Sequence, residues 1–130
     1  MSSAAERVGI DLQSVAPVRD SLREHAARYL ERVYTEREVE DSRRDGAVDP
    51  ERLAARFAAK EATLKVLRPG ADDPVPWRCI EVRRRPEGWV DLELSGPAAA
   101  LAEQAGLRDL SVSITHDGGF AAAIVIARCC

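Results

Sequence analysis

One stretch, from Pro50 to Leu67, constrains the fold more than any other part of the chain. Its pattern is helical: Asp49 suits the N-cap, Pro50 suits the first helical position, and Pro69-Gly70 ends the run. Five alanines lie opposite a face of larger apolar side chains, those of Leu53, Phe57, Leu64 and Leu67. A helix that is apolar or small on nearly every side is usually buried, and alanines let neighbouring backbones approach closely. We therefore expect the fold to be built around this helix.

Three charged residues interrupt this helix where burial would make them costly. Lys60 falls within the apolar face, Glu61 lies on its flank, and Lys65 follows one turn after Glu61. Burying an unpaired charge costs on the order of several kcal/mol, so such groups need a partner, a metal ion or a solvated cleft. The simplest alternative is an i,i+4 surface pair between Glu61 and Lys65, worth only about a few tenths of a kcal/mol. The helix pattern by itself leaves both interpretations open.

The bulk properties describe one soluble globular domain over residues 1–130. The sequence is 45% hydrophobic and 32% charged, which argues against disorder. Its longest apolar run, 120–127, is too short to cross a bilayer, and the polar N-terminus predicts no signal peptide. A net charge of −3 argues against a general nucleic-acid binder. The cysteines, including Cys129 and Cys130, fit neither a disulfide framework nor zinc-ligand spacing, so we expect a cytoplasmic protein in which this terminal pair is incidental.

The first recognisable element is a strand. Val8, Ile10 and Leu12 alternate with Gly9 and Asp11, which is typical of a strand with two different faces. Aspartate is disfavoured inside strands. Asp11 therefore either ends the strand or is held on it as a metal ligand.

Two helices are predicted next. The first runs from Pro17 to Val33, and its expected inner stripe consists of Val18, Leu22, Ala26, Tyr29 and Val33. Several arginines lie off that stripe, Arg19 and Arg23 among them, and form either a solvated face or a docking surface for an acidic partner. Thr35 followed by Glu38 has the capping-box pattern and predicts a second, short helix.

The C-terminal half predicts two hairpins and a short helix. Alternating segments at 79–83 and 89–94 flank a Pro-Glu-Gly turn, and an Asp-Gly turn separates 110–116 from 120–127. A short helix is expected over 97–105. His116 stands at a strand end beside the turn, where a histidine is most often a surface or capping residue. The whole pattern predicts an α+β chain with at least five strands and four helices.

Several segments occur together in a fixed order. They are Gly9-Ile10-Asp11 on the first strand, Tyr34-Thr35 followed by Glu38, Arg56-Phe57-Ala58-Ala59-Lys60-Glu61-Ala62 on the helix, and Ser113-Ile114-Thr115-His116 before the last strand. Together they resemble the short, single-domain holo-acyl-carrier-protein synthases, a group of 4′-phosphopantetheinyl transferases. The resemblance extends from about Val8 to Ala127. It implies the α+β fold of that family, with an antiparallel sheet packed against a long central helix, and a homotrimer with active sites at the subunit interfaces.

The resemblance also implies a reaction. Enzymes of this family transfer 4′-phosphopantetheine from coenzyme A to a serine of an apo acyl or polyketide carrier protein and release adenosine 3′,5′-bisphosphate, with magnesium bridging the pyrophosphate. By position, Asp11 and Glu61 would hold Mg²⁺, a hard dication that prefers carboxylate oxygens. Lys65 would lie at the transferred phosphate. The residues assigned to the coenzyme A phosphates are Arg56, Lys60 and His116. Glu61 would also take up the serine proton, directly or through a water, and the sequence does not decide between these routes.

The chain departs from the family pattern in the docking region. Relatives carry an arginine six residues after the first aspartate, where this chain has Pro17, so Arg19 and Arg23 are the candidates for docking an acidic carrier. Relatives also often have Gly-x-Pro in the first hairpin, where this chain has Gly88-Trp89-Val90. Two alternatives are a non-catalytic module that binds a carrier and a magnesium-dependent hydrolase of nucleotide pyrophosphates. Neither the carrier, from fatty acid biosynthesis or from polyketide synthesis, nor the tolerance for acylated coenzyme A is indicated by the sequence.

Overall fold

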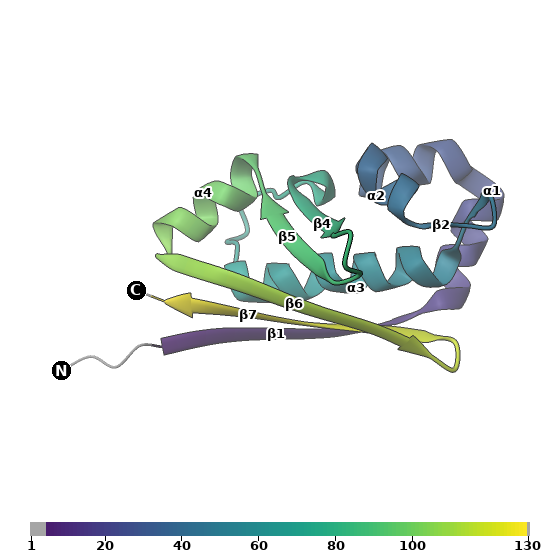
Figure 1. The fold of residues 1–130 in the computed structure, drawn as a ribbon. Coiled ribbons are helices and arrows are strands. Elements are labelled where there is room, and N and C mark those ends of the chain that lie inside the picture. Colours follow the sequence, from purple (N-terminus) through teal and green to yellow (C-terminus); the bar gives the residue numbers. More distant parts are fainter. Residues whose placement is uncertain (1–4, 130) are drawn as a thin grey trace.

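The computed structural model describes residues 5–129, which form an α+β fold with three antiparallel sheets (Figure 1). The largest sheet has the strand order β1-β7-β6, made of β1 (Ala5–Ser14), β7 (Phe120–Cys129) and β6 (Leu107–Asp117). The two smaller sheets pair β2 (Arg43–Arg44) with β3 (Ala47–Val48) and β4 (Ile80–Arg84) with β5 (Val90–Leu94). The helices are α1 (Val15–Val33), α2 (Glu36–Asp41), α3 (Pro50–Leu67) and α4 (Gly96–Gln104), and a 3₁₀ turn spans Trp77–Cys79. The α+β class predicted from the sequence is confirmed.

Helix α3 lies along one face of the large sheet, with α2, β4 and β5 on its other side (Figure 1). Its alanines are buried and pack against apolar side chains of the strands, such as Val82 of β4 and Val125 of β7. The helix begins as the sequence predicts, because Asp49 Oδ1 accepts a hydrogen bond from the Glu51 backbone N–H at 2.9 Å. It ends at Arg68, which adopts the left-handed conformation with a φ of 54°. The predicted bounds of this helix match the observed ones.

Helix α1 differs from its prediction in one respect. Val18 and Val33 are buried as expected, but Ala26 is exposed instead of lying on the inner stripe. His25 is not helical, with φ −140° and ψ 36°, and therefore kinks the helix. Ala26 directly follows this kink and turns outward, whereas Tyr29 and Val33 further along the helix still pack in the core. No pattern in the sequence signalled this break.

The outer face of the large sheet is apolar and open to solvent. Five large side chains on this face are between 38% and 65% exposed, namely Val8, Ile10, Leu12, Ile124 and Ile126. The strand register brings them together, because Val8 pairs with Ile126 and Ile10 pairs with Ile124. The alternation that predicted the first strand thus turns its apolar side outward, while Gly9 lies against α3. An exposed apolar patch of this kind marks an interaction surface.

Strand β1 lies so close to α3 that position 9 has room only for glycine. A Cβ atom on Gly9 would lie 2.1 Å from the Ala62 carbonyl oxygen and 3.2 Å from the Lys65 Cβ. Two hydrogen bonds hold the same contact: Arg7 Nη1 donates to the Val66 carbonyl at 2.9 Å, and Lys65 Nζ donates to the Ile10 carbonyl at 2.7 Å. This contact fixes Gly9 and Ile10 against α3, and it therefore also fixes the position of Asp11, which follows them on β1.

We expect Gly9→Ala to lower the free energy of unfolding by about 1–3 kcal/mol, because the added methyl group forces β1 away from α3. Urea unfolding measures this loss. Gly70→Ala is the matched control, since its Cβ would meet no backbone atom and only the Asp73 carboxylate, at 3.1 Å, which can rotate away at the loss of one exposed hydrogen bond to the Gly70 N–H. An unfolding free energy of Gly9→Ala equal to that of Gly70→Ala would contradict the close approach.

Two remaining expectations concern membranes and cysteines. Within residues 5–129, no helix combines the length and the apolar character that crossing a membrane requires. Cys79 and Cys129 are half-buried free thiols. Cys130 lies outside the described residues, so the expectation that the terminal pair is incidental stays a prediction.

Candidate functional site

Two acidic residues and a lysine come together where β1 crosses α3. Lys65 Nζ lies 3.4 Å from Asp11 Oδ1, and Asp11 Oδ2 accepts a hydrogen bond from Gln13 Nε2 at 2.6 Å. Glu61 lies close enough to Asp11 for the charge of Asp11 to affect its titration. Partial burial and then the Asp11 charge raise the pKa of the Glu61 carboxyl, whereas Lys65 lowers it. The structure therefore brings Asp11, Glu61 and Lys65 near one another, while the roles that the resemblance implies for them stay predictions.

The chemistry of this cluster fits a magnesium ion. Two neighbouring carboxylates repel each other, and a bound cation relieves that repulsion. Carboxylate oxygens are hard ligands, and Mg²⁺ commonly takes only one or two of them while keeping waters and binding phosphate oxygens. Within residues 5–129, no group of three or more His, Cys, Asp or Glu side chains is placed to hold a metal. Two carboxylates from one subunit are enough for such a site and would leave coordination positions for a phosphate.

A second feature is a basic cavity of about 260 Å³ on another side of α3. Arg52 and Arg56 of α3, Arg84 of β4 and His116 of β6 line it, and Asp41 of α2 is its one acidic lining residue. His116 Nδ1 lies 3.0 Å from Glu51 Oε2, which holds the imidazole at the cavity edge. Guanidinium groups are well suited to binding phosphate. The cavity has the charge and size to hold a phosphate group.

Arg56 is the buried arginine of this cavity, and part of its hydrogen-bonding capacity is unused. The residue is only 3% exposed, and its Nη1 donates to the Arg52 carbonyl at 3.2 Å. Its Nε is buried and has no hydrogen-bond partner among the residues that the structure describes. Burial lowers the pKa of Arg56, while the charges of Asp41 and Glu38 raise it. A buried donor without an acceptor is costly, so an anion entering the cavity would stabilise this arginine.

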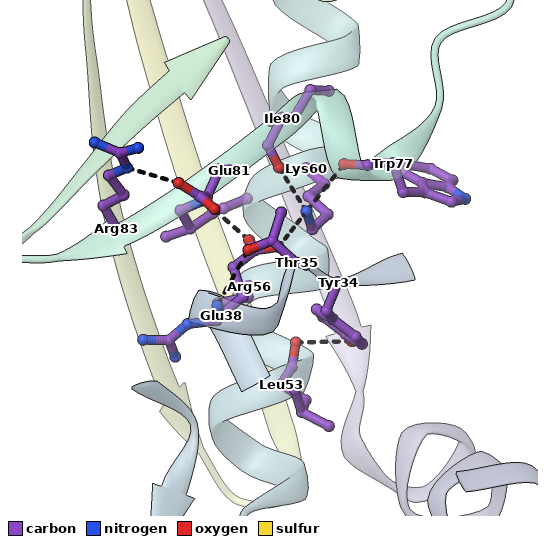
Figure 2. A network of polar contacts seen from close by, with 12 residues as sticks. Tyr34, Thr35, Glu38, Leu53, Arg56, Lys60, Trp77, Ile80, Glu81 and Arg83 are labelled. Atoms are coloured by element: carbon purple, nitrogen blue, oxygen red, sulfur yellow. Dashed lines mark hydrogen bonds and ion pairs between the residues drawn. The ribbon is translucent and has the colours of Figure 1, made fainter. Parts of the chain in front are cut away.

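Lys60, which the resemblance assigned to a coenzyme A phosphate, is a buried structural residue (Figure 2). Its Nζ lies 2.7 Å from Glu38 Oε1, 3.0 Å from the Trp77 carbonyl oxygen and 2.5 Å from the Ile80 carbonyl oxygen. An ammonium group has three protons, and all of them are donated within the protein. Because none remains for a phosphate, the structure contradicts the assignment of Lys60.

The partner of Lys60 is the glutamate that caps α2. Glu38 accepts hydrogen bonds from the Thr35 N–H through Oε1 and from the Val82 N–H through Oε2, both at 2.9 Å (Figure 2). The Glu38 N–H donates in turn to Thr35 Oγ1 at 3.1 Å, which completes the predicted capping box. One buried carboxylate thus joins α2, α3 and β4. Burial lowers the pKa of Lys60, and the negative charge of Glu38 opposes that shift.

The remaining predicted residues lie on the surface of α1. Arg19 is exposed and has no ion pair among residues 5–129, whereas Arg23 Nη2 lies 2.7 Å from Asp20 Oδ1. The charge of Arg23 is therefore partly neutralised on its own helix. A larger cavity of about 500 Å³ lies between α1 and α2. It contains none of the predicted site residues, and its charged lining is mixed, with three glutamates and the arginines Arg43 and Arg78.

Sequence reasoning missed two arginines of the basic cavity. Arg52 lies one helical turn before Arg56, a spacing of four residues that places both side chains on one side of α3. That spacing was a usable signal for Arg52. Arg84 lies on another element, β4, and no spacing in the sequence linked it to the arginines of α3.

A family model, related proteins and solved structures all match this chain over nearly its whole length. A family model described as the 4′-phosphopantetheinyl transferase superfamily matches residues 7–125. A holo-[acyl-carrier-protein] synthase of Solibacter usitatus is 37% identical over 118 residues, which cover 91% of this chain and 94% of that protein. The solved ACPS–CoA complex of Chronobacterium ammoniagenes has a TM-score of 0.81 at 33% identity and covers 95% of this chain and 97% of that one. The Helicobacter pylori holo-[acyl-carrier-protein] synthase in complex with coenzyme A has a TM-score of 0.78 at 28% identity, covering 92% and 98%.

Proposed function

This chain belongs to the holo-acyl-carrier-protein synthases of the 4′-phosphopantetheinyl transferase superfamily, and from that membership we propose that it transfers 4′-phosphopantetheine from coenzyme A to a serine of an apo acyl carrier protein. The transfer is magnesium-dependent, releases adenosine 3′,5′-bisphosphate and takes place in a single domain. The observation that carries the proposal is the cluster of Asp11, Glu61 and Lys65, which combines a cation site with a phosphate-binding ammonium group.

Each residue of the cluster has a distinct role in the proposed reaction. Asp11 and Glu61 would hold Mg²⁺, which when bound neutralises the diphosphate and stabilises the charge that spreads over the transferred phosphoryl group. The serine oxygen forms a bond to phosphorus as the bond between phosphorus and the bridging oxygen breaks, and the bisphosphate leaves. Lys65, whose side chain is 53% exposed, neutralises charge on the transferred phosphate. Glu61 would also accept the serine proton, directly or through a water.

The basic cavity is proposed to hold a phosphate of coenzyme A that is not transferred. Arg56 and His116 keep the roles that the resemblance implies, and Arg52 and Arg84 join them. Arg56 and Glu61 are five residues apart on α3, which corresponds to about 140° around the helix axis. Their side chains therefore point in different directions, and the cation site and the basic cavity of one subunit open on different sides of α3. A single coenzyme A can engage both kinds of site if two subunits contribute to it.

The exposed apolar face of the large sheet supports a homotrimer with interfacial active sites. Five large apolar side chains on β1 and β7 are open to solvent, and Asp11 belongs to the same strand as three of them. A second and a third copy covering this face would remove the apolar surface from water. They would also bring the basic cavity of a neighbour towards the carboxylates.

We expect Ile124→Lys to be monomeric at concentrations where the unmodified protein is trimeric, because a charge in the middle of the apolar face opposes its burial. Size-exclusion chromatography with light scattering measures the mass. Ala100→Lys, on the exposed surface of α4, adds the same charge elsewhere and is expected to leave the mass unchanged. A trimeric Ile124→Lys would contradict this interface.

The exposed arginines of α1 are proposed to dock the carrier. Carrier proteins of this class are expected to be acidic, and a local basic surface attracts them even though the net charge of this chain is −3. Arg19 is the stronger candidate, since Asp20 partly neutralises Arg23. A cytoplasmic location is part of the same proposal, and fractionation of cells that express the protein tests it.

We expect the basic cavity and the docking surface to be separable by kinetics. Arg84→Gln removes a phosphate contact and is expected to raise the Michaelis constant for coenzyme A roughly tenfold, with little effect on that for the carrier. Arg19→Glu is expected to do the reverse. Steady-state assays that vary one substrate at a time measure both constants, and each variant is the control for the other. If both variants changed the two constants equally, the assignments of these sites would be wrong.

A mass measurement tests the function itself. The protein is incubated with coenzyme A, Mg²⁺ and each of several apo carriers from fatty acid and polyketide synthesis, and each carrier is then weighed. The proposal predicts that at least one carrier gains the mass of one phosphopantetheinyl group. Carrier binding without any mass gain would favour the non-catalytic module. Release of adenosine bisphosphate without a carrier would favour the hydrolase.

A further inference from the structure

We propose that Lys65 occupies the cation position beside Asp11 in the metal-free enzyme and moves to the diphosphate when the metal and coenzyme A bind. Lys65 would then couple the two binding steps, so that the metal binds weakly to the free enzyme and more tightly in the presence of coenzyme A. This inference rests on the proposed function, because it concerns the same two carboxylates.

The contacts of Lys65 hold its ammonium group against one of the two proposed metal ligands, Asp11. Its Nζ lies 3.4 Å from Asp11 Oδ1 and 2.7 Å from the Ile10 carbonyl oxygen. Among residues 5–129, Lys65 is the only cation in an ion pair with Asp11. Gln13 holds the other oxygen of Asp11, so the Asp11 side chain is already oriented. Lys65 and a metal ion would therefore compete for Asp11 Oδ1.

Lys65 differs from Lys60 in its freedom to move. Lys60 is buried and donates all three of its protons, whereas the Lys65 side chain is 53% exposed and has two acceptors. The ammonium group of Lys65 is readily hydrated when it leaves, whereas the Asp11 side chain is only 13% exposed and still needs a cation beside it. A divalent cation can therefore displace the ammonium group without disturbing the fold.

The competition predicts a thermodynamic coupling. In the free enzyme, a metal ion must displace the Lys65 ammonium group from Asp11. The displaced ammonium group stays nearby, and its positive charge repels the metal ion. When the diphosphate is present, its negative oxygens bind the ammonium group, so the ammonium group no longer weakens metal binding. Each ligand therefore raises the affinity for the other by the same factor.

Manganese binding tests the inference without relying on turnover. Binding of Mn²⁺ is measured by electron paramagnetic resonance, with and without saturating coenzyme A and with no carrier present. We expect coenzyme A to tighten Mn²⁺ binding about tenfold in the unmodified protein. Lys65→Met is expected to bind Mn²⁺ several-fold more tightly than the unmodified protein in the absence of coenzyme A. Its tightening by coenzyme A is expected to be smaller by the same factor, and what remains comes from direct contact between the ion and the diphosphate. Lys65→Arg, which keeps the charge, is the matched control and is expected to retain the coupling.

Two outcomes separate this inference from the proposed function. If Lys65→Met binds Mn²⁺ no more tightly than the unmodified protein, while Asp11→Asn abolishes binding and the carrier still gains mass, the inference is wrong and the function stands. If the unmodified protein neither binds Mn²⁺ nor modifies any carrier, the proposed function is wrong as well. Circular dichroism of each variant establishes that it is folded, and Lys65→Gln provides a second neutral replacement.

Discussion

Glu61→Gln is expected to fold normally and to lose at least about 100-fold of the magnesium-dependent transfer rate. The glutamine has the same shape but no negative charge, so it holds a dication poorly and cannot accept the serine proton. Glu61 is half-buried and makes no side-chain hydrogen bond or ion pair within residues 5–129, so the fold does not depend on its charge. The rate of carrier mass gain and the unfolding temperature measure the two effects.

The pH dependence of the transfer rate provides a second check on the role of Glu61. Because burial and Asp11 raise the pKa of Glu61 above its ordinary value of 4.5, its ionised form is lost at a higher pH than usual. Protonated Glu61 binds Mg²⁺ poorly, so at a low Mg²⁺ concentration the transfer rate of the unmodified protein should fall as the pH is lowered through the raised pKa of the metal-free site. Glu103→Gln, on the exposed side of α4, is the matched control and should leave both the rate and its pH profile unchanged. Full activity of Glu61→Gln would remove Glu61 from the site.

Lys60→Met is expected to lower the free energy of unfolding by about 3–5 kcal/mol. The change leaves Glu38 buried without its cation and leaves the Trp77 and Ile80 carbonyl groups without their donor. Urea unfolding measures the loss. Lys65→Met removes the other lysine of α3, which is exposed, and is expected to change stability by less than about 1 kcal/mol.

A double variant tests whether the buried charge causes this loss. Adding Glu38→Gln to Lys60→Met removes the uncompensated carboxylate, so part of the stability is expected to return. A Lys60→Met protein of normal stability with a raised Michaelis constant for coenzyme A would restore the original assignment of Lys60 to a phosphate.

The parts of the fold that were predicted correctly depend on local signals. The capping box of Thr35 and Glu38, the start of α3 at Pro50 and the Asp-Gly turn before β7 each involve only a few neighbouring residues. The kink at His25 had no such signal. The alternation in β1 revealed two different faces, but which face is exposed depends on packing between distant segments.

Some residues of the candidate site were predicted only through the family resemblance, and others were not predicted at all. The residue pattern left Asp11 with two interpretations, and only the family resemblance linked it to Glu61 and Lys65. The pattern indicated correctly that Lys60 needed a partner, but Glu38 is 22 residues away and belongs to another helix. Only the folded chain brings the two together, and the same is true of Arg84 in the basic cavity.

A crystal structure with coenzyme A and Mn²⁺, recorded at the manganese absorption edge, tests the central claim most directly. We predict an anomalous peak between the carboxylates of Asp11 and Glu61, in contact with the diphosphate, with another phosphate in the basic cavity of a neighbouring subunit. Coenzyme A bound with no ion at these two carboxylates, or with the ion held elsewhere, would contradict the account.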